Sequence, residues 1–166
     1  LELMSTRDGM TGVFNRRHWE TLLRNEFEAC RRSHRQATIL LIDIDHFKTI
    51  NDTWGHDVGD EAIVAITRQL QLTLRSGDYI GRFGGDEFAV IMSGTPADSA
   101  IAAMSRVHER LVNMPLHGAP MARLCISVGV APWGAQFTHY REWLKAADVA
   151  LYKAKNAGRG RTEVAA

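Results

Sequence analysis

The order of apolar runs in this sequence predicts an α/β (α+β) fold with a ferredoxin-like, palm-type β-α-β-β-α-β core, in which helices surround a central antiparallel sheet. Three observations predict this fold. Residues 38–44 form an unbroken apolar run that is too short for a lone helix and indicates a buried strand. Two further apolar runs flank the letters GGDE at residues 84–87, which is typical of a hairpin. Segments with the helical spacing of apolar residues separate these strands.

The first half of the chain places two long helices around the first strand. Residues 16–32 carry apolar side chains at helical spacing and predict a helix ahead of the core. That face consists of Trp19, Leu22, Leu23, Phe27 and Cys30. The strand at residues 38–44 follows, interrupted by Asp43. After a loop around residues 54–56, residues 59–74 repeat the helical spacing and predict a second long helix.

The hairpin joins residues 79–80 to residues 88–92. Gly84 and Gly85 stand between these runs, and glycine is the residue that takes positive φ without steric cost. We therefore expect a tight turn with positive φ at this point.

The last part of the chain completes the core and adds one helix. Residues 97–111 predict a third helix and residues 123–130 another strand. Residues 140–157 again show helical spacing, and Gly158 is a typical helix stop.

Length and composition are those of one ordinary globular domain. The chain has 166 residues, of which 45% are hydrophobic and 23% charged, with a net charge of +1. We expect a single domain over residues 1–166, with residues 1–15 as a linker and the start of the domain. Because the chain begins at Leu1, we expect it to be a C-terminal piece of a longer protein. The net charge gives no overall field that would favour a nucleic-acid polymer.

The cysteines and the apolar runs predict the compartment. Cys30 and Cys125 lack the spacing of a zinc site, so we expect both to be reduced and buried. No run approaches the ~20 apolar residues of a membrane span. A cytoplasmic domain is expected, with a membrane involved only through a region upstream of this chain.

Acidic residues at two places in the predicted sheet indicate a metal site. Asp43 and Asp45 end the first strand, and Asp86 and Glu87 lie at the hairpin turn. In the predicted topology all four carboxylates can converge, which is unfavourable unless a divalent cation binds them. Mg²⁺ or Mn²⁺ shared with substrate phosphates then points to phosphoryl or nucleotidyl transfer. The alternative is that Asp86 and Glu87 belong to an ordinary polar turn and only make its tip hydrophilic.

Three basic residues could accompany such a site. Lys48 follows the first strand, and Lys155 and Arg159 stand four apart near the end of the last helix. Lys155 and Arg159 could simply be solvated charges at a helix end, where they complement the helix dipole. Alternatively, the basic residues bind phosphate groups beside the metal.

Five blocks of this sequence, in order and over nearly the whole chain, resemble the GGDEF family of diguanylate cyclases. They read RDGMTGVFNRR (7–17), DIDHFKTINDTWGHDVGD (43–60), RFGGDEF (82–88), ISVGVA (126–131) and ADVALYKAKNAGRGR (147–161). The resemblance implies an enzyme that condenses two GTP molecules into cyclic di-GMP and two pyrophosphates. Each 3′-hydroxyl attacks the α-phosphate of the other GTP across a homodimer.

The resemblance also implies the metal ligands and catalytic residues. Asp43 and Asp86 would hold two Mg²⁺ or Mn²⁺ ions, with the backbone carbonyl of Ile44 assisting and Glu87 close by. Asp45 is not in the main ligand set of the family. The general base stays unassigned.

Further positions match the GTP-binding residues of the family. The resemblance implies that Phe47 and Lys48 would open a triphosphate-binding turn and that Lys155 and Arg159 would form a second phosphate clamp. The remaining matches are Asn51 and Asp60, which would recognise guanine, and Gly84 and Gly85, which would leave room for the nucleotide. A carboxylate suits guanine, since guanine offers N1–H and an exocyclic amine while adenine presents an acceptor at N1.

One more motif matches an inhibitory product site. Arg75 and Asp78 form an RxxD pattern, and Arg106 matches an accessory arginine. These residue types suit a guanine nucleotide with phosphates, so the resemblance implies feedback by cyclic di-GMP. Asp8, Asn15 and Arg16 match an opening motif that would fasten the preceding segment to the domain.

Three alternatives stay open at this point. The chain could be an inactive cyclic di-GMP receptor, another palm-type nucleotidyl cyclase or polymerase, or a module that serves for dimerisation or docking. Intact metal, phosphate and base positions argue against the first, and the missing basic surface argues against a polymerase.

Overall fold

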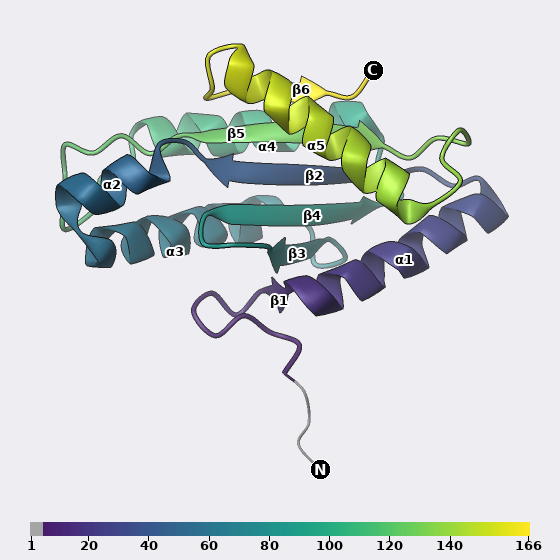
Figure 1. Ribbon diagram of the computed structural model, residues 1–166, viewed down its shortest axis with the longest axis horizontal. Helices are drawn as coiled ribbons and strands as arrows, with labels where there is room; N and C mark the ends of the chain where they lie inside the picture. Colours follow the sequence, from purple (N-terminus) through teal and green to yellow (C-terminus); the bar gives the residue numbers. More distant parts are fainter. Residues whose placement is uncertain (1–4) are drawn as a thin grey trace.

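The computed structural model describes residues 5–166. Within this range it contains five helices and a six-stranded sheet (Figure 1). The helices are α1 (Arg16–Ser33), α2 (Phe47–Trp54), α3 (His56–Thr73), α4 (Ala97–Val112) and α5 (Tyr140–Asn156). The strands are β1 (Phe14–Asn15), β2 (Ala37–Ile44), β3 (Tyr79–Arg82), β4 (Glu87–Ser93), β5 (Ile126–Pro132) and β6 (Thr162–Val164). None of the helices described is long and apolar enough to cross a membrane.

The sheet confirms the predicted core. Its strand order is β1-β3-β4-β2-β5-β6, and the four central strands are antiparallel. The first strand of the core, β2, lies between β4 and β5, as the β-α-β-β-α-β arrangement requires. The edge strands β1 and β6 pair in parallel with their neighbours. They were not predicted, because two or three residues are too few to show a period of two.

Two layers of helices cover the sheet, which explains the unbroken apolar run of β2. Leu40, Ile42 and Ile44 pack toward α3 and α4, whereas Ile39 and Leu41 pack toward α1 and α5. Figure 1 shows α1 and α5 on the near face of the sheet and α3 and α4 behind it. Burying each such side chain stabilises the fold by about 1.5–3 kcal/mol. Because alternate residues share a face, Asp43 points to the side of α5.

Helix ends agree closely with the sequence where a capping residue is present. The Asn15 side chain accepts a hydrogen bond from the His18 N–H and caps α1. His139 and Glu142 form a capping box that starts α5. Between β2 and β3 the prediction missed the eight-residue helix α2, which is short for a clear helical period and ends at Gly55, with φ of 93°, inside the predicted loop around residues 54–56. Helix α3 therefore begins three residues before the predicted start.

The two cysteines differ. Cys30 is buried in the packing between α1 and the sheet, as predicted. Cys125 is exposed, so the prediction that it is buried was wrong. The physical reason is that β5 begins at Ile126, three residues later than predicted, and Cys125 lies in the loop before it. Both are free thiols, as expected for reduced cysteines.

Candidate active site

The ends of two adjacent strands bring acidic residues together. Asp43, near the end of β2, lies opposite Glu87, the first residue of β4. The Ile44 N–H donates a hydrogen bond to the Asp86 carbonyl at 3.0 Å, which docks the hairpin turn on β2. The predicted proximity of Asp43 and Asp86 is therefore found.

Electrostatics at this pair favour a cation. Burial, together with the neighbouring Asp43 carboxylate, raises the pKa of Asp86 to about 6. Asp43 Oδ1 is buried and finds no hydrogen-bond partner within residues 5–166. A crowded acid pair with an unpartnered buried oxygen is a donor set that suits Mg²⁺ or Mn²⁺.

Of the other two acids, Asp45 points away from this pair, whereas Glu87 stays beside it and its charge also raises the pKa of Asp86. Asp45 turns toward the segment after α5, where its carboxylate accepts hydrogen bonds from Ser127 Oγ at 2.6 Å and the Gly160 N–H at 2.8 Å. Glu87 is exposed. Within the described range, no group of three or more His, Cys, Asp or Glu side chains could hold a metal. Convergence of four carboxylates is thus not found, because Asp45 is held by Ser127 and Gly160 instead. The role of Glu87 as a ligand stays a prediction.

Arg82 holds the GGDE turn in place, a role that sequence reasoning missed. Its Nε donates to the Gly84 carbonyl at 3.1 Å and its terminal nitrogen to the Gly85 carbonyl at 2.9 Å. The same guanidinium contacts Asp8 at 3.2 Å, which fastens the segment before α1 to the turn. The position of Arg82, two residues before Gly84, was the available signal.

The two glycines of the turn do not adopt the backbone conformation that was predicted. Neither Gly84 nor Gly85 has positive φ, so the prediction of a positive-φ turn was wrong. Arg82 bonds to their carbonyls, and a hydrogen bond from the Phe83 N–H to the Glu87 carbonyl at 2.8 Å closes a loop longer than a two-residue turn. A Cβ at Gly85 would meet nothing within 4 Å, and one at Gly84 would touch only Glu87. The fold leaves this space free.

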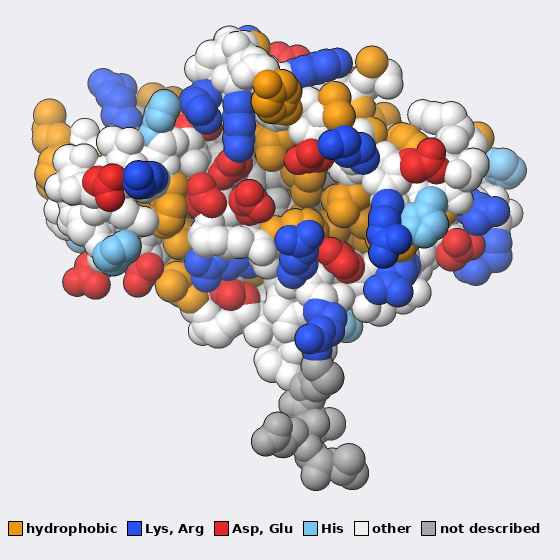
Figure 2. All heavy atoms as spheres, in the orientation of Figure 1, with side chains coloured by type: hydrophobic (Ala, Val, Ile, Leu, Met, Phe, Trp, Pro, Cys, Tyr) orange, Lys and Arg blue, Asp and Glu red, His pale blue; other side chains and the backbone are white. Residues whose placement is uncertain are grey.

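Two of the predicted phosphate-binding residues lie where α5 ends. Lys155 Nζ contacts Asp43 Oδ2, and Arg159 lies 4.0 Å from Asp45 Oδ1. Figure 2 shows acidic and basic side chains side by side on this part of the near face. Phe47 begins α2 directly after β2, and Lys48 follows it with an exposed side chain. The first turn of α2 thus lies beside the acid pair.

The predicted base-recognising residues flank one helix junction. Asn51, on α2, has a buried side-chain oxygen without a hydrogen-bond partner in the described part of the chain. That oxygen lies against Gly59 of α3, where a Cβ would overlap it. Asp60 follows Gly59 and is exposed. Gly59, which sequence reasoning passed over, therefore makes room for Asn51.

A pocket lies at the opposite end of β4 from the acid pair. Arg75, Asp78 and Arg106, the three predicted inhibitory-site residues, all line this pocket of about 380 Å³. The Asp78 carboxylate accepts a hydrogen bond from the Arg75 N–H at 2.8 Å, and burial raises the pKa of Asp78. The Arg75 guanidinium contacts Thr95 Oγ1, a partner that the sequence did not reveal.

Comparisons with known proteins agree with this arrangement. The family model described as "Diguanylate cyclase, GGDEF domain" matches residues 5–161. The probable diguanylate cyclase DgcC of Escherichia coli K12 is 75% identical over 166 residues, which are 100% of this chain and 45% of that protein. The chain therefore spans less than half the length of this relative.

Solved structures of similar fold carry related descriptions. The GGDEF domain of DgcB from Caulobacter crescentus, solved with c-di-GMP, has a TM-score of 0.92 at 26% identity and covers 99% of this chain and 98% of that one. The diguanylate cyclase SiaD of Pseudomonas aeruginosa, solved with its activator SiaC, has a TM-score of 0.89 at 36% identity. That match covers 97% of this chain and 62% of SiaD.

Proposed function

Because this chain belongs to the family of diguanylate cyclase GGDEF domains, we propose that it joins two GTP molecules into cyclic di-GMP and releases two pyrophosphates. The observation that carries the proposal is the acid pair at the end of β2. Asp43 has a buried oxygen without a partner in the described range, and the pKa of Asp86 is raised to about 6. Such a pair favours a bound cation beside a phosphate.

The residues of this pair would hold Mg²⁺ or Mn²⁺, two ions per site, with the Ile44 carbonyl and Glu87 assisting. When bound, such an ion would supply Lewis-acid chemistry at the α-phosphate, the attacking 3′-hydroxyl and the leaving pyrophosphate. Asp43 and Asp86 contribute two carboxylates fixed by the β2–β4 pairing, so little reorganisation is needed when substrate arrives.

The surrounding residues would bind and orient GTP. The N–H groups of the first turn of α2, opened by Phe47 and Lys48, meet the phosphates. Lys155 and Arg159 form the second clamp from the end of α5. Asn51 and Asp60 contact the guanine edge. Gly84 and Gly85 leave the free space across which the nucleotide lies.

Turnover requires two copies of the domain. Each site holds one GTP, and the 3′-hydroxyl of one GTP attacks the α-phosphorus of the other, so two domains must face each other. We propose a transient homodimer on the cytoplasmic side, controlled by a region outside residues 1–166. DgcC, of which this chain covers 45%, is long enough to include such a region.

The product would also bind at the pocket of Arg75, Asp78 and Arg106. Its arginines suit phosphates, and its carboxylate suits the N–H edge of guanine. The complex of DgcB with c-di-GMP supports product binding in a related domain. We propose feedback inhibition through this pocket.

The test is an incubation of the domain with GTP and Mg²⁺, followed by mass analysis of the products. The proposal predicts cyclic di-GMP and pyrophosphate in a ratio of one to two, at a rate per domain that rises with protein concentration. A different nucleotide product would point to another nucleotidyl cyclase or to a polymerase.

A second candidate function is that of a cyclic di-GMP receptor without turnover. The pocket lined by Arg75, Asp78 and Arg106 supports this candidate, since the pocket involves no part of the acid pair. Retained nucleotide binding without product at high protein concentration would support the receptor. Full biological output from an Asp86→Ala variant would instead support a docking or dimerisation module.

A further inference from the structure

Asp45 is a buried acid that the proposed chemistry leaves without a role. Its side chain is 3% exposed, and a buried carboxylate is unfavourable unless it is hydrogen-bonded. Oδ1 accepts from Ser127 Oγ at 2.6 Å and Oδ2 accepts from the Gly160 N–H at 2.8 Å. Both oxygens are therefore satisfied, and one of the bonds reaches a residue far along the chain, beyond α5.

The segment that Asp45 reaches has an unusual backbone. Gly158, Arg159 and Gly160 have φ values of 117°, 64° and 58°. An L side chain disfavours this left-handed region, so Arg159 needs support from its neighbours. The Arg159 N–H donates to the Ala154 carbonyl at 3.0 Å, and the next N–H is bound by Asp45. The backbone of Arg159 is thus fixed on both sides.

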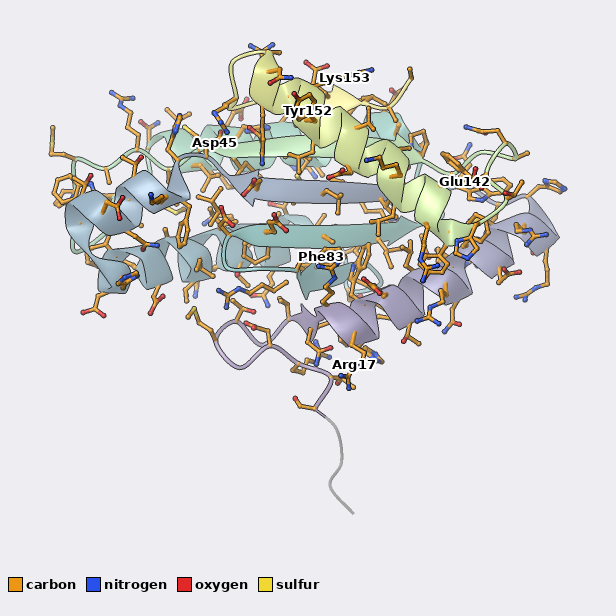
Figure 3. The ribbon with its side chains drawn as sticks, in the orientation of Figure 1. Arg17, Asp45, Phe83, Glu142, Tyr152 and Lys153 are labelled. Atoms are coloured by element: carbon orange, nitrogen blue, oxygen red, sulfur yellow. The ribbon has the colours of Figure 1, made fainter. Side chains whose placement is uncertain are left out.

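Charge also links the two segments. Asp45 Oδ1 lies 4.0 Å from the Arg159 guanidinium, and two residues earlier Asp43 contacts Lys155. Two acids at the end of β2 thereby face two bases at the end of α5. Figure 3 shows Asp45 at the end of the sheet over which α5 finishes.

We propose that Asp45 is a positioning residue that fixes the loop after α5 and thereby aims Arg159 at the polyphosphate of the bound nucleotide. This inference rests on the proposed function, in which Arg159 is a phosphate clamp. Asp45 itself does not touch the nucleotide. Its effect passes through the Gly160 N–H, and a planar guanidinium needs a fixed direction to bind phosphate with two nitrogens.

Two substitutions separate the geometry from the charge. Asp45→Ala removes both hydrogen bonds. Asp45→Asn keeps an oxygen for the Gly160 N–H and offers its NH₂ group to the Ser127 hydroxyl, so it restores the geometry without the charge. Ser127→Ala is the matched control, because it removes one hydrogen bond of Asp45 and leaves the bond to Gly160 in place.

The first measurement compares the affinities for GMP and for a GTP analogue with a methylene bridge between the α- and β-phosphates. We expect Asp45→Ala to reduce the preference for the triphosphate about tenfold, as for a lost charged hydrogen bond. Asp45→Asn and Ser127→Ala should keep it within about threefold of wild type. Adding Asp45→Ala to Arg159→Ala should cost little more, because coupled residues are not additive.

The second measurement is amide hydrogen exchange at Gly160 in the nucleotide-free domain. Exchange should be faster in Asp45→Ala and remain slow in Asp45→Asn. Unchanged exchange, or an unchanged triphosphate preference in Asp45→Ala, would overturn the positioning role. A wild-type domain that binds neither nucleotide would overturn the proposed function instead, while exchange at Gly160 would still decide whether Asp45 holds the loop.

Discussion

The two ends of β4 carry two acid sites of opposite kinds. At its start, Asp86 lies beside Asp43, whose buried Oδ1 is without a partner in residues 5–166. Beyond its end, Arg75 satisfies the Asp78 carboxylate and lines a pocket with Arg106. The strand Glu87–Ser93 separates the two sites, which is roughly 20 Å at about 3.3 Å per residue. In the first site, Lys155 contacts one oxygen of Asp43 and leaves the other buried oxygen without a partner, which favours a bound cation. In the second site, Arg75 pairs with the carboxylate.

The comparison predicts that only one of the two sites depends on a divalent cation. Catalysis at the Asp43–Asp86 pair should need a divalent cation, and product binding at the Arg75 pocket should not. Variants at one end should therefore leave the other end unaffected, because substitutions this far apart act independently.

The largest expected effect is that of Asp86→Asn. We expect the rate of cyclic di-GMP formation to fall by at least about 10²-fold, because one fixed charge beside the reacting phosphate is lost. Calorimetric titration with cyclic di-GMP should give the wild-type affinity. Turnover within threefold of wild type would contradict the assignment of Asp86 to the catalytic cation site.

Arg75→Ala is the converse experiment. Loss of a charged hydrogen-bond donor should weaken cyclic di-GMP binding about 10- to 100-fold and abolish product inhibition. The initial rate with fresh GTP should stay near the wild-type rate. A matched loss of initial rate would show that the two ends are coupled.

Gly85→Ala tests the free space at the turn. Since a Cβ there meets nothing within 4 Å and φ is not positive, the free energy of unfolding should change by less than about 1 kcal/mol. The KM for GTP should rise about tenfold, because the methyl group occupies space assigned to the nucleotide. Denaturant unfolding and steady-state kinetics give both values, and normal turnover would refute the assignment.

Lys155→Gln tests whether Lys155 and a metal ion compete for Asp43. Lys155 contacts Asp43 and neutralises it, so it competes with any metal for that carboxylate. Without nucleotide, we expect the variant to bind Mn²⁺ severalfold more tightly, measured by electron paramagnetic resonance, and GTP more weakly. Lys145→Gln, on the same helix, is the matched control. Weaker Mn²⁺ binding in Lys155→Gln would contradict this interpretation.

The smallest expected effect is on the way thermal stability depends on pH. The pKa of Asp86 is raised from 3.8 to about 6, so the folded domain binds this proton more tightly than the unfolded chain. This group favours folding at low pH, and its contribution is lost as pH rises from about 4 to about 6. Without metal, Asp86→Asn should match wild type in Tm near pH 4 and exceed it by a few degrees near pH 7.5. Thermal unfolding at both pH values measures this, and equal Tm values throughout would contradict it.

Much of the fold could be predicted because its signals are local. The unbroken run of β2 and the capped helix α1 are explicit in the sequence, and the topology then brought Asp43 to Asp86. The loop around residues 54–56 was predicted, but the helix α2 before it was missed, since eight residues show little more than two turns of helical spacing. Cys125 was wrongly expected to be buried because strand starts carry weak signals.

Other parts of the site depend on contacts between distant segments. The hydrogen-bond partners of Asp45 are Ser127 and Gly160, and no local pattern in the sequence predicts either pairing. Arg82 replaces glycine geometry as the support of the GGDE turn, which a turn rule based on φ does not foresee. Gly59 beside Asn51 likewise becomes visible only when two helices are packed.

The most direct test is one Mg²⁺ titration of the wild-type domain with two readouts, cyclic di-GMP formation from GTP and equilibrium binding of cyclic di-GMP. The comparison predicts no formation without the metal, formation that rises and saturates with Mg²⁺, and product binding that stays constant throughout. Formation without a divalent cation, no formation at any Mg²⁺ concentration, or product binding that requires Mg²⁺ would contradict it.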